Sequence, residues 1–208
     1  VAKSKNAAYN DQSITKLKGA DRVRLRPAVI FGSDGLEGCE HSFFEILSNA
    51  VDEAREGYGD KIFYFTGKTT TAISALNAID IMRDQIGDLR SIHISSKDKC
   101  CVSFPPLSRR KCDPKHCHVT RGYFDRINDA ILELLQNYRT YTKDIIDTVS
   151  AKYNVCAYEL SLELSEWCEL IVCDYNYLFD LNAYLRRYFE CYDGAENIFL
   201  IDEAHNLP

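Results

Sequence analysis

The chain has 208 residues, of which 46% are hydrophobic and 27% are charged, and its formal net charge at pH 7 is −6. This composition is ordinary for a soluble globular protein and excludes collagen-like, low-complexity and wholly disordered chains. No apolar run reaches the roughly 18 residues that a membrane-spanning helix needs. Residues 1–12 are polar and contain no secretory signal, so we expect a cytoplasmic location.

The apolar pattern predicts helices and strands that alternate from residue 62 onward. Before that point it predicts a flexible arm over 1–10, a short strand at 28–31 and a helix over 41–56. The later strands are expected at 62–66, 90–95, 170–173 and 197–201, the last two buried, and the helices at 70–83, 124–138, 143–153 and 183–189. Such alternation predicts an α/β fold with a mostly parallel sheet.

Positive charge is concentrated in one stretch that also holds four of the nine cysteines. Residues 97–126 carry eight Lys or Arg against three Asp or Glu, whereas residues 127–208 carry five against fifteen. The stretch, unlike the whole chain, has the charge of a nucleic-acid-binding element. Cysteine clusters in a reducing compartment bind metal more often than they form disulfides. Four other cysteines lie in apolar surroundings and are predicted core residues: Cys39, Cys168, Cys173 and Cys191.

Four cysteines are separated by ten, four and thirty-eight residues: Cys101, Cys112, Cys117 and Cys156. Four thiolates can hold a [4Fe–4S] cluster, because each iron takes one thiolate. The compact set of Cys112, His116, Cys117 and His118 would instead suit zinc. The spacing therefore predicts a metal site without choosing between the two.

Oxygen-bearing side chains recur on the predicted helix over 41–56. Glu45, Asn49 and Glu53 are spaced by four residues and share one face, and Asp52 lies beside them. Glu45 could act as a general base for water, and Asn49 could bind Mg²⁺ through its amide oxygen. On spacing alone, the solvated face of an amphipathic helix would look the same.

The last predicted strand runs directly into an Asp-Glu-Ala-His sequence at 202–205. Carboxylates at the carboxyl end of a parallel strand are typical of nucleotide sites in α/β proteins. We predict that Asp202 holds Mg²⁺, that Glu203 polarises the attacking water and that His205 couples the nucleotide to the nucleic acid. The alternative is an ordinary acidic strand end.

A nucleotide site of this kind also needs a phosphate loop, and Gly67-Lys68-Thr69 matches only its last half. The first glycine of that loop would fall at residue 62, which is Ile62. Because the segment follows a predicted strand directly, we interpret it as a strand-end DNA contact rather than a phosphate loop.

Residues 9–62 resemble the start of the type IIA topoisomerase ATPase subunit, the gyrase B family. The motifs that carry the resemblance are the stretches 9–14, 17–19, 23–27 and 31–33, and residues 44–54, which resemble the first motif of the GHKL ATPase fold. The resemblance implies Glu45 as the water-activating base, Asn49 as a Mg²⁺ ligand and nucleotide binding by Asp52 and Glu53. It also implies an arm around Tyr9 that embraces a second subunit. The family's adenine-reading and lid glycine motifs are absent after residue 62.

Residues 63–208 resemble the iron–sulfur helicases of the XPD/DinG family. The motifs are the stretches 95–101, 112–117, 122–126, 155–160, 174–180 and 202–207, the last containing a DEAH box. The resemblance implies that Cys101, Cys112, Cys117 and Cys156 hold a [4Fe–4S] cluster, with Cys100 as a one-residue alternative to the first. The family are superfamily 2 helicases that use ATP and Mg²⁺ and usually move 5′ to 3′ on single-stranded DNA.

Basic and aromatic side chains around the cysteines are then predicted to contact single-stranded DNA. The basic ones are Lys97, Lys99, Arg109, Arg110, Lys111, Lys115, Arg121 and Arg126, and Tyr175 and Tyr177 would line the DNA path. Phe104, Tyr123 and Phe124 could stack on bases, although the helical pattern favours a core position for Phe124. Tyr177 and Phe179 are equally compatible with packing roles.

The two resemblances meet near Ile62 without a linker. We therefore predict two segments, a partial GHKL α+β segment over 1–62 and a partial RecA-like motor domain over 63–208, with a mainly helical Fe–S insert at 97–164. We expect a chimeric or truncated reading frame that hydrolyses ATP poorly by itself. The alternatives are a gyrase B-like ATPase subunit and a single-stranded DNA-binding module without activity.

Overall fold

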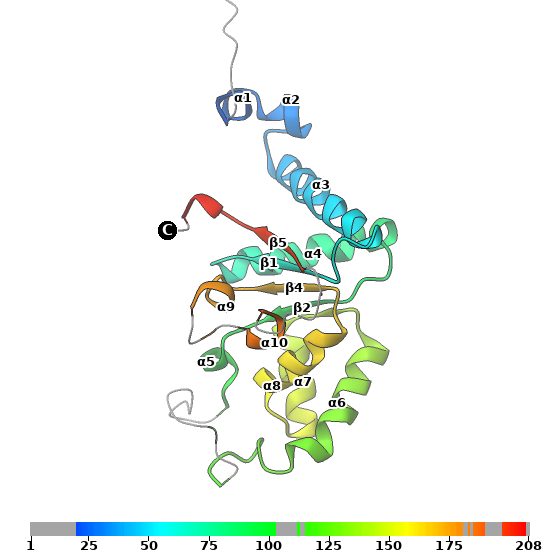
Figure 1. The fold of residues 1–208 in the computed structure, drawn as a ribbon, viewed down its shortest axis with the longest axis vertical. Helices are drawn as coiled ribbons and strands as arrows, with labels where there is room; N and C mark the ends of the chain where they lie inside the picture. Colours follow the sequence, from blue (N-terminus) through cyan, green and yellow to red (C-terminus); the bar gives the residue numbers. More distant parts are fainter. Residues whose placement is uncertain are drawn as a thin grey trace, which may run out of the picture. The chain divides into compact units, whose positions relative to one another are not determined.

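The computed structural model describes residues 20–102, 112, 115–180, 183, 185–189 and 197–206 (Figure 1). The chain divides into two compact units, residues 1–43 and 44–208. The border between them falls inside helix α3 (Leu36–Arg55). The predicted border at residue 62 follows sequence resemblance rather than compactness, and it stays a prediction.

The second unit contains a five-stranded sheet with the strand order β3-β2-β4-β1-β5. Its strands are β1 (Lys61–Phe65), β2 (Ser91–Ile94), β3 (Thr140–Tyr141), β4 (Leu170–Cys173) and β5 (Asn197–Ile201). Every neighbouring pair is parallel, and Phe63 on β1 lies in register with Ile171 on β4 and Phe199 on β5. The predicted α/β class with a parallel sheet is confirmed.

Burial along the strands follows their position in the sheet. All four residues of β4 are buried, as expected for a central parallel strand covered on both faces. By contrast, β5 is only half-buried, and its Phe199 is 42% exposed. The prediction of a buried strand at 197–201 is therefore wrong in its burial. An apolar run of five residues is compatible with a central strand or an edge strand, because its burial depends on which other elements cover it in the fold.

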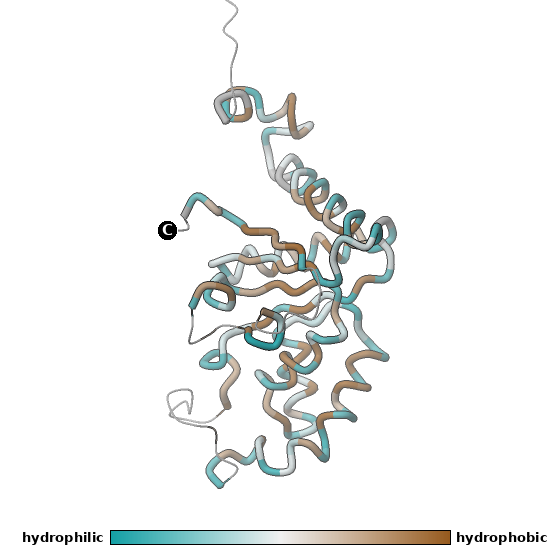
Figure 2. Tube along the Cα trace, viewed as in Figure 1, coloured by the Kyte–Doolittle hydropathy of each residue, from teal (hydrophilic) through white to brown (hydrophobic). Residues whose placement is uncertain are grey.

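Long helices cover the sheet, and one-turn helices occupy several of its loops. The helices are α4 (Thr69–Ile86), α5 (Lys97–Cys100), α6 (Tyr123–Asn137), α7 (Lys143–Tyr153), α8 (Ala157–Leu164), α9 (Asn176–Phe179) and α10 (Arg186–Phe189), with 3-10 turns η3 (Ser165–Trp167) and η4 (Ala204–Asn206). Figure 1 shows α6, α7 and α8 gathered on the β2 side of the sheet. The strands form the hydrophobic centre in Figure 2, and Phe63, Ile92, Leu134 and Leu160 are fully buried in the core. None of the described helices is long and apolar enough to cross a membrane.

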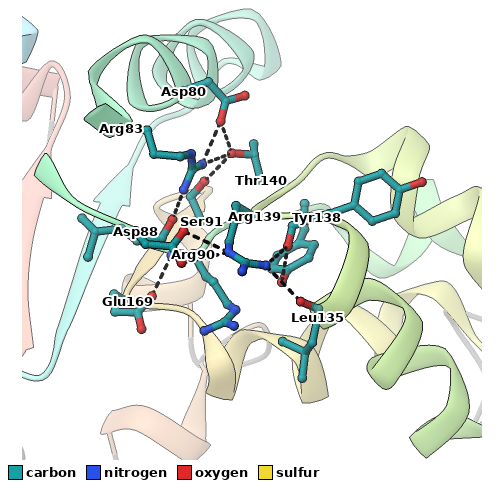
Figure 3. Close-up of polar contacts among 12 residues, drawn as sticks. Asp80, Arg83, Asp88, Arg90, Ser91, Leu135, Tyr138, Arg139, Thr140 and Glu169 are labelled. Atoms are coloured by element: carbon teal, nitrogen blue, oxygen red, sulfur yellow. Dashed lines mark hydrogen bonds and ion pairs between the residues drawn. The ribbon is translucent and has the colours of Figure 1, made fainter. Parts of the chain in front are cut away.

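The predicted insert at 97–164 is mostly helical, but it also supplies strand β3, which the sequence pattern missed. A strand of two residues is too short to show a period. Side chains at the amino ends of β2 and β3 hold β3 in place (Figure 3). Arg83 on α4 donates to Thr140 Oγ1 at 2.6 Å and to Asp80 Oδ1 at 2.8 Å, and Ser91 Oγ lies 3.1 Å from Thr140 Oγ1. Residues 97–164 thus contribute a strand to the parallel sheet.

The first unit begins, in its described part, with two short helices, α1 (Ala20–Leu25) and α2 (Pro27–Phe31). The strand predicted at 28–31 is therefore wrong. Pro27 at the first helical turn favours a helix start, and Gly32, with a φ of +76°, ends the helix in the left-handed conformation. The helix predicted at 41–56 is confirmed as α3, which starts five residues earlier. The predicted arm with Tyr9 lies outside the described residues.

Candidate functional site

Two predicted motifs meet at the carboxyl ends of β1 and β5. The strands lie in register, with Phe65 beside Ile201. Beyond them, Thr66 Oγ1 donates to Asp202 Oδ2 at 3.2 Å, and the Asp202 amide donates to the Phe65 carbonyl oxygen at 3.0 Å. Thr66 is only 3% exposed, so its hydroxyl is fixed in this contact. The fold therefore places the segment 66–69 directly against the acidic box at 202–205.

Tyr175, from the loop after β4, braces this contact. Its hydroxyl donates to the Asp202 carbonyl oxygen at 3.1 Å. Its ring covers Gly67, where an added Cβ atom would lie 2.8 Å from a ring carbon. A side chain at residue 67 would have to displace the ring, so a glycine is needed there. Tyr175, predicted to line the DNA path, thus also positions the acidic box.

Glu203 and Lys68 form an ion pair across the same edge. Lys68 Nζ lies 3.5 Å from Glu203 Oε1, and the two side chains are 69% and 44% exposed. Glu203 has a φ of +47°, in the left-handed region that non-glycine residues adopt at an energetic cost. His205 follows in η4 and is exposed.

The segment between β1 and α4 is too short for a phosphate loop. β1 ends at Phe65 and α4 begins at Thr69, which leaves three residues between them. The chain from residue 61 to 86 is described throughout. The interpretation of residues 66–68 as a strand end rather than a phosphate loop is therefore confirmed, whereas their contact with DNA stays a prediction.

A cavity of about 480 Å³ opens beside this segment, which is a volume typical of ligand sites. It is bordered by the chain that follows β1, β2 and β4. Its charged lining residues are Lys68, Lys97, Lys99, Asp98, Asp174 and Asp180. Lys99 Nζ also donates to Thr69 Oγ1 at 3.2 Å, at the start of α4. The predicted DNA-binding residues Lys97 and Lys99 are thus brought together at one cavity.

His93 on β2 also lines this cavity, and no motif in the sequence singled it out. Burial lowers the pKa of His93, and the charges of Lys99 and Lys143 lower it further. The imidazole is therefore neutral at pH 7 and can donate one hydrogen bond and accept another. Its place in a short apolar strand carried no signal that could have identified it.

The other predicted DNA-binding residues divide into several groups. Arg109, Arg110, Lys111 and Phe104 lie outside the described residues, and Lys115 and Arg121 are exposed. Arg126 donates to the carbonyl oxygens of Tyr153, Asn154 and Arg121, at 3.0, 2.9 and 2.7 Å, so its guanidinium group serves the structure. Tyr177 lines the cavity but is 5% exposed, and its hydroxyl donates to the Ser95 carbonyl oxygen at 3.0 Å.

The aromatic pair at the start of α6 is arranged opposite to the expectation from the helical pattern. Tyr123 is 9% exposed, whereas Phe124 is 84% exposed and packs edge-on against the Tyr123 ring at 5.5 Å. The core position expected for Phe124 is therefore wrong, because the buried stripe of α6 begins one residue earlier. Phe124 is available for base stacking, and Tyr123 is not.

The four predicted cluster ligands surround one small pocket. Cys101, Cys112, Cys117 and Cys156 all line it, although they come from segments up to 55 residues apart. Its volume is about 20 Å³, and Val102, Val119 and Ala157 contribute apolar walls. Within the described ranges, no three Cys, His, Asp or Glu side chains stand close enough together to hold a metal ion. His116 and His118, of the alternative zinc set, are exposed and do not line the pocket.

Cys100 lines the same pocket but has a partner of its own. Its Sγ lies 3.9 Å from the Ser95 carbonyl oxygen. Burial raises the pKa of the Cys100 thiol to about 11, so it is protonated at neutral pH. The choice between Cys100 and Cys101 as the first ligand stays a prediction. Cys168 and Cys173 are 1% exposed, as predicted for core residues, whereas neither the Cys39 side chain nor Cys191 is described.

Lys97 joins the two cavities. It lines both, as does Tyr158, and its Nζ lies 5.7 Å from the centre of the Tyr158 ring. Burial lowers the pKa of Lys97, but a hydrogen bond with Cys112 and nearby negative charges outweigh burial, so the net shift is upward. Lys97, which lines both cavities, therefore carries a positive charge at neutral pH.

The oxygen-bearing side chains predicted as site residues on α3 are exposed and line neither cavity. Glu45, Asn49, Asp52 and Glu53 are all exposed. The Asp52 carboxylate pairs with Arg55 at 3.9 Å along the helix. Neither cavity described above includes any of the four. The described residues place all four on one exposed helix, and their roles in nucleotide binding stay a prediction.

Comparison with known proteins gives two separate similarities. The B subunit of DNA topoisomerase 4 from Enterococcus faecalis is 48% identical over 62 residues, which is 30% of this chain and 9% of that protein. The B subunit of DNA gyrase from Thermus thermophilus is 51% identical over 55 residues, 26% of this chain and 9% of that protein. The chain thus spans about a tenth of the length of these relatives.

The second similarity is to a family model. Residues 68–208 match the model of the DEAD_2 family, the XPD/DinG-type helicase domain. This match covers more than half of the chain. It includes strands β2 to β5, the cysteine pocket, the acidic box and most of the larger cavity, whereas β1, Thr66 and Gly67 precede it. The chain therefore belongs to the DEAD_2 family.

Proposed function

We propose that this chain is the nucleic-acid-binding part of an ATP-dependent DNA helicase that carries a [4Fe–4S] cluster. In its complete form, the protein would couple ATP hydrolysis to movement along single-stranded DNA and to unwinding. The observation that carries the proposal is the shared wall of Lys97 and Tyr158 between the lysine-lined cavity and the cysteine pocket. A strand bound in the larger cavity would lie beside the cluster. We further propose that the protein acts in the cytoplasm.

The residue types of the cysteine pocket suit a [4Fe–4S] cluster, because four of its five thiols could each bind one iron and its apolar walls would shield the cluster from water. Within the described residues no three of these side chains are close enough to hold a metal ion, so a bound cluster would have to draw the thiols together. Cys101, Cys112, Cys117 and Cys156 would be the ligands. When bound, such a cluster ties its ligands together and can accept one electron. Lys97 would compensate the negative charge of the thiolates from the side of the larger cavity.

We expect the anaerobically purified chain to contain about four irons and four acid-labile sulfides. Cys112→Ser should lose them, because a hydroxyl is a poor ligand for iron. Cys168→Ser is the matched control, since Cys168 is a buried cysteine outside the pocket. The folded fraction of this variant should keep the same iron content as the wild-type protein. Stoichiometric zinc, or iron that survives in Cys112→Ser, would contradict the cluster assignment.

The nucleotide part of the proposal concerns the acidic box after β5. Asp202 would hold Mg²⁺, Glu203 would orient the attacking water and His205 would link the nucleotide to the nucleic acid. Support comes from the position of these residues at the carboxyl edge of a parallel sheet, where nucleotides bind in α/β proteins. Since residues 61–86 contain no phosphate loop, we expect little hydrolysis by this chain alone.

Single-stranded DNA is the proposed partner, and Lys99 provides a direct test. Lys99→Gln should weaken binding of an oligothymidylate and reduce the slope of log K against log salt by about 0.7, the value for one phosphate contact on a single strand. Fluorescence anisotropy over a salt series measures both. Lys152→Gln is the control, because Lys152 pairs with Glu133 on the helical layer. Equal effects of the two variants would refute the assignment of the cavity.

A second candidate function rests on the similarity to topoisomerase subunits. There the exposed face of α3 would supply Glu45 as the base and Asn49 as the Mg²⁺ ligand, with Asp52 and Glu53 nearby, and an arm around Tyr9 would join two subunits. ATP hydrolysis that requires Glu45 but not Glu203 would favour this candidate.

A further inference from the structure

Lys68 contacts both the acidic box and the larger cavity. Lys68 lines the cavity, and its Nζ lies 3.5 Å from Glu203 Oε1. Asp202 and Glu203 do not line the cavity. Lys68 therefore has a carboxylate on one side and, on the other, a space that Lys97 and Lys99 also border.

The backbone on both sides of this ion pair is fixed. The hydrogen bond from Thr66 to Asp202 and that from the Asp202 amide to Phe65 join the ends of β1 and β5. Tyr175 covers Gly67 and binds the Asp202 carbonyl oxygen. Lys68 can consequently change partners by rotating its long side chain alone, without a movement of the strands.

We propose that Glu203 competes with a backbone phosphate of single-stranded nucleic acid for Lys68. The inference rests on the proposed function of the cavity as a strand site and adds an internal inhibitor to it. A phosphate that takes Lys68 releases the Glu203 carboxylate from its cationic partner. A ligand that engages Glu203 leaves Lys68 available for the strand. By thermodynamic linkage the two effects are equal in size, so the ion pair couples the acidic box to the cavity.

The weakness of the pair allows the exchange. Both partners are well exposed, at 69% and 44%, and an ion pair of this kind changes an equilibrium constant by about two- to five-fold. A phosphate bound beside Lys97 and Lys99 is attracted by three lysines of the cavity and repelled by its carboxylates Asp98, Asp174 and Asp180, whereas the ion pair between Glu203 and Lys68 involves one ammonium group. The strand can therefore displace Glu203, at a measurable cost in affinity.

A double-mutant cycle on the full chain tests the competition. The variants are Glu203→Gln, Lys68→Gln and their combination, and the probe is a fluorescein-labelled oligothymidylate of about 12 nucleotides at low salt. We expect Glu203→Gln to tighten binding about two- to five-fold when Lys68 is present. The gain should vanish in the Lys68→Gln background, because no cation remains to be released.

Asp98→Asn is the matched control, because Asp98 is a cavity carboxylate and the substitution removes the same charge. Its gain should be the same with Lys68 or Gln at residue 68. If Glu203→Gln behaves like this control, or changes nothing, the competition is refuted while binding at the cavity stands. If wild-type protein does not bind the probe at all, the proposed function fails, and the competition fails with it.

Discussion

Phe63→Ala should destabilise the second unit by about 3–5 kcal/mol, the range for removal of a fully buried aromatic ring. Phe63 has no exposed surface and sits on β1 between β4 and β5. Its ring contacts four others, stacking on Phe65 at 5.9 Å and meeting Tyr188, Phe189 and Phe199 at 5.2 to 5.8 Å. Removing it leaves a cavity under α10 and at the open edge of the sheet.

Such a loss is a large share of the roughly 5–15 kcal/mol that keeps a domain folded. The midpoint of urea unfolding, followed by circular dichroism, measures it. Phe124→Ala is the matched control, since Phe124 is 84% exposed and its loss should change stability by less than about 0.5 kcal/mol. Similar midpoints for the two variants would show that Phe63 does not occupy the centre of the core.

Arg83→Met should release strand β3 and cost about 2–3 kcal/mol, because it removes hydrogen bonds to a charged group and leaves polar partners unpaired. The Arg83 side chain is 21% exposed and joins three parts of the chain (Figure 3). It binds Asp80 on its own helix, Thr140 on β3 and the Leu89 carbonyl oxygen before β2. Methionine keeps the length of the stem without the donors.

Hydrogen exchange distinguishes local release from general destabilisation. The Ser91 amide donates to the Arg139 carbonyl oxygen at 2.9 Å, so its protection reports pairing beside β3. We expect that protection to fall more than the protection of β4 in Arg83→Met. Lys143→Met is the control, because its ion pair with Asp147 lies along one helix with both side chains partly exposed, and such a pair is worth at most about 1 kcal/mol. Equal loss in both variants would argue against a special role for Arg83.

The sequence alone predicted most elements because they are long enough to show a period. Helices α3, α4, α6 and α7 and strands β1, β2, β4 and β5 lie within a few residues of their expected positions. The failures are short elements. The five residues of α2 suit a strand or a helix, and the elements for which no range was predicted, namely α1, α5, α8, α9 and β3, have eight residues or fewer. At that length, neighbouring structure decides the conformation.

Residue identity and chain order also determined which groups meet at the carboxyl edge of the sheet. Once β1 and β5 are parallel neighbours, the residues after them must lie side by side, so Thr66 meets Asp202. The cysteines were identified by spacing and resemblance, and the fold gathers all four around one pocket.

Only the tertiary structure decided how these groups are connected. The common wall of Lys97 and Tyr158, the ion pair of Lys68 with Glu203 and the place of His93 all join segments far apart in the chain. Exposure was likewise decided by packing, which buries Tyr123 and exposes Phe124 although they are adjacent. Periodicity fixes which face of an element is apolar, whereas contacts between elements depend on how the sheet and helices pack, and no local pattern encodes that.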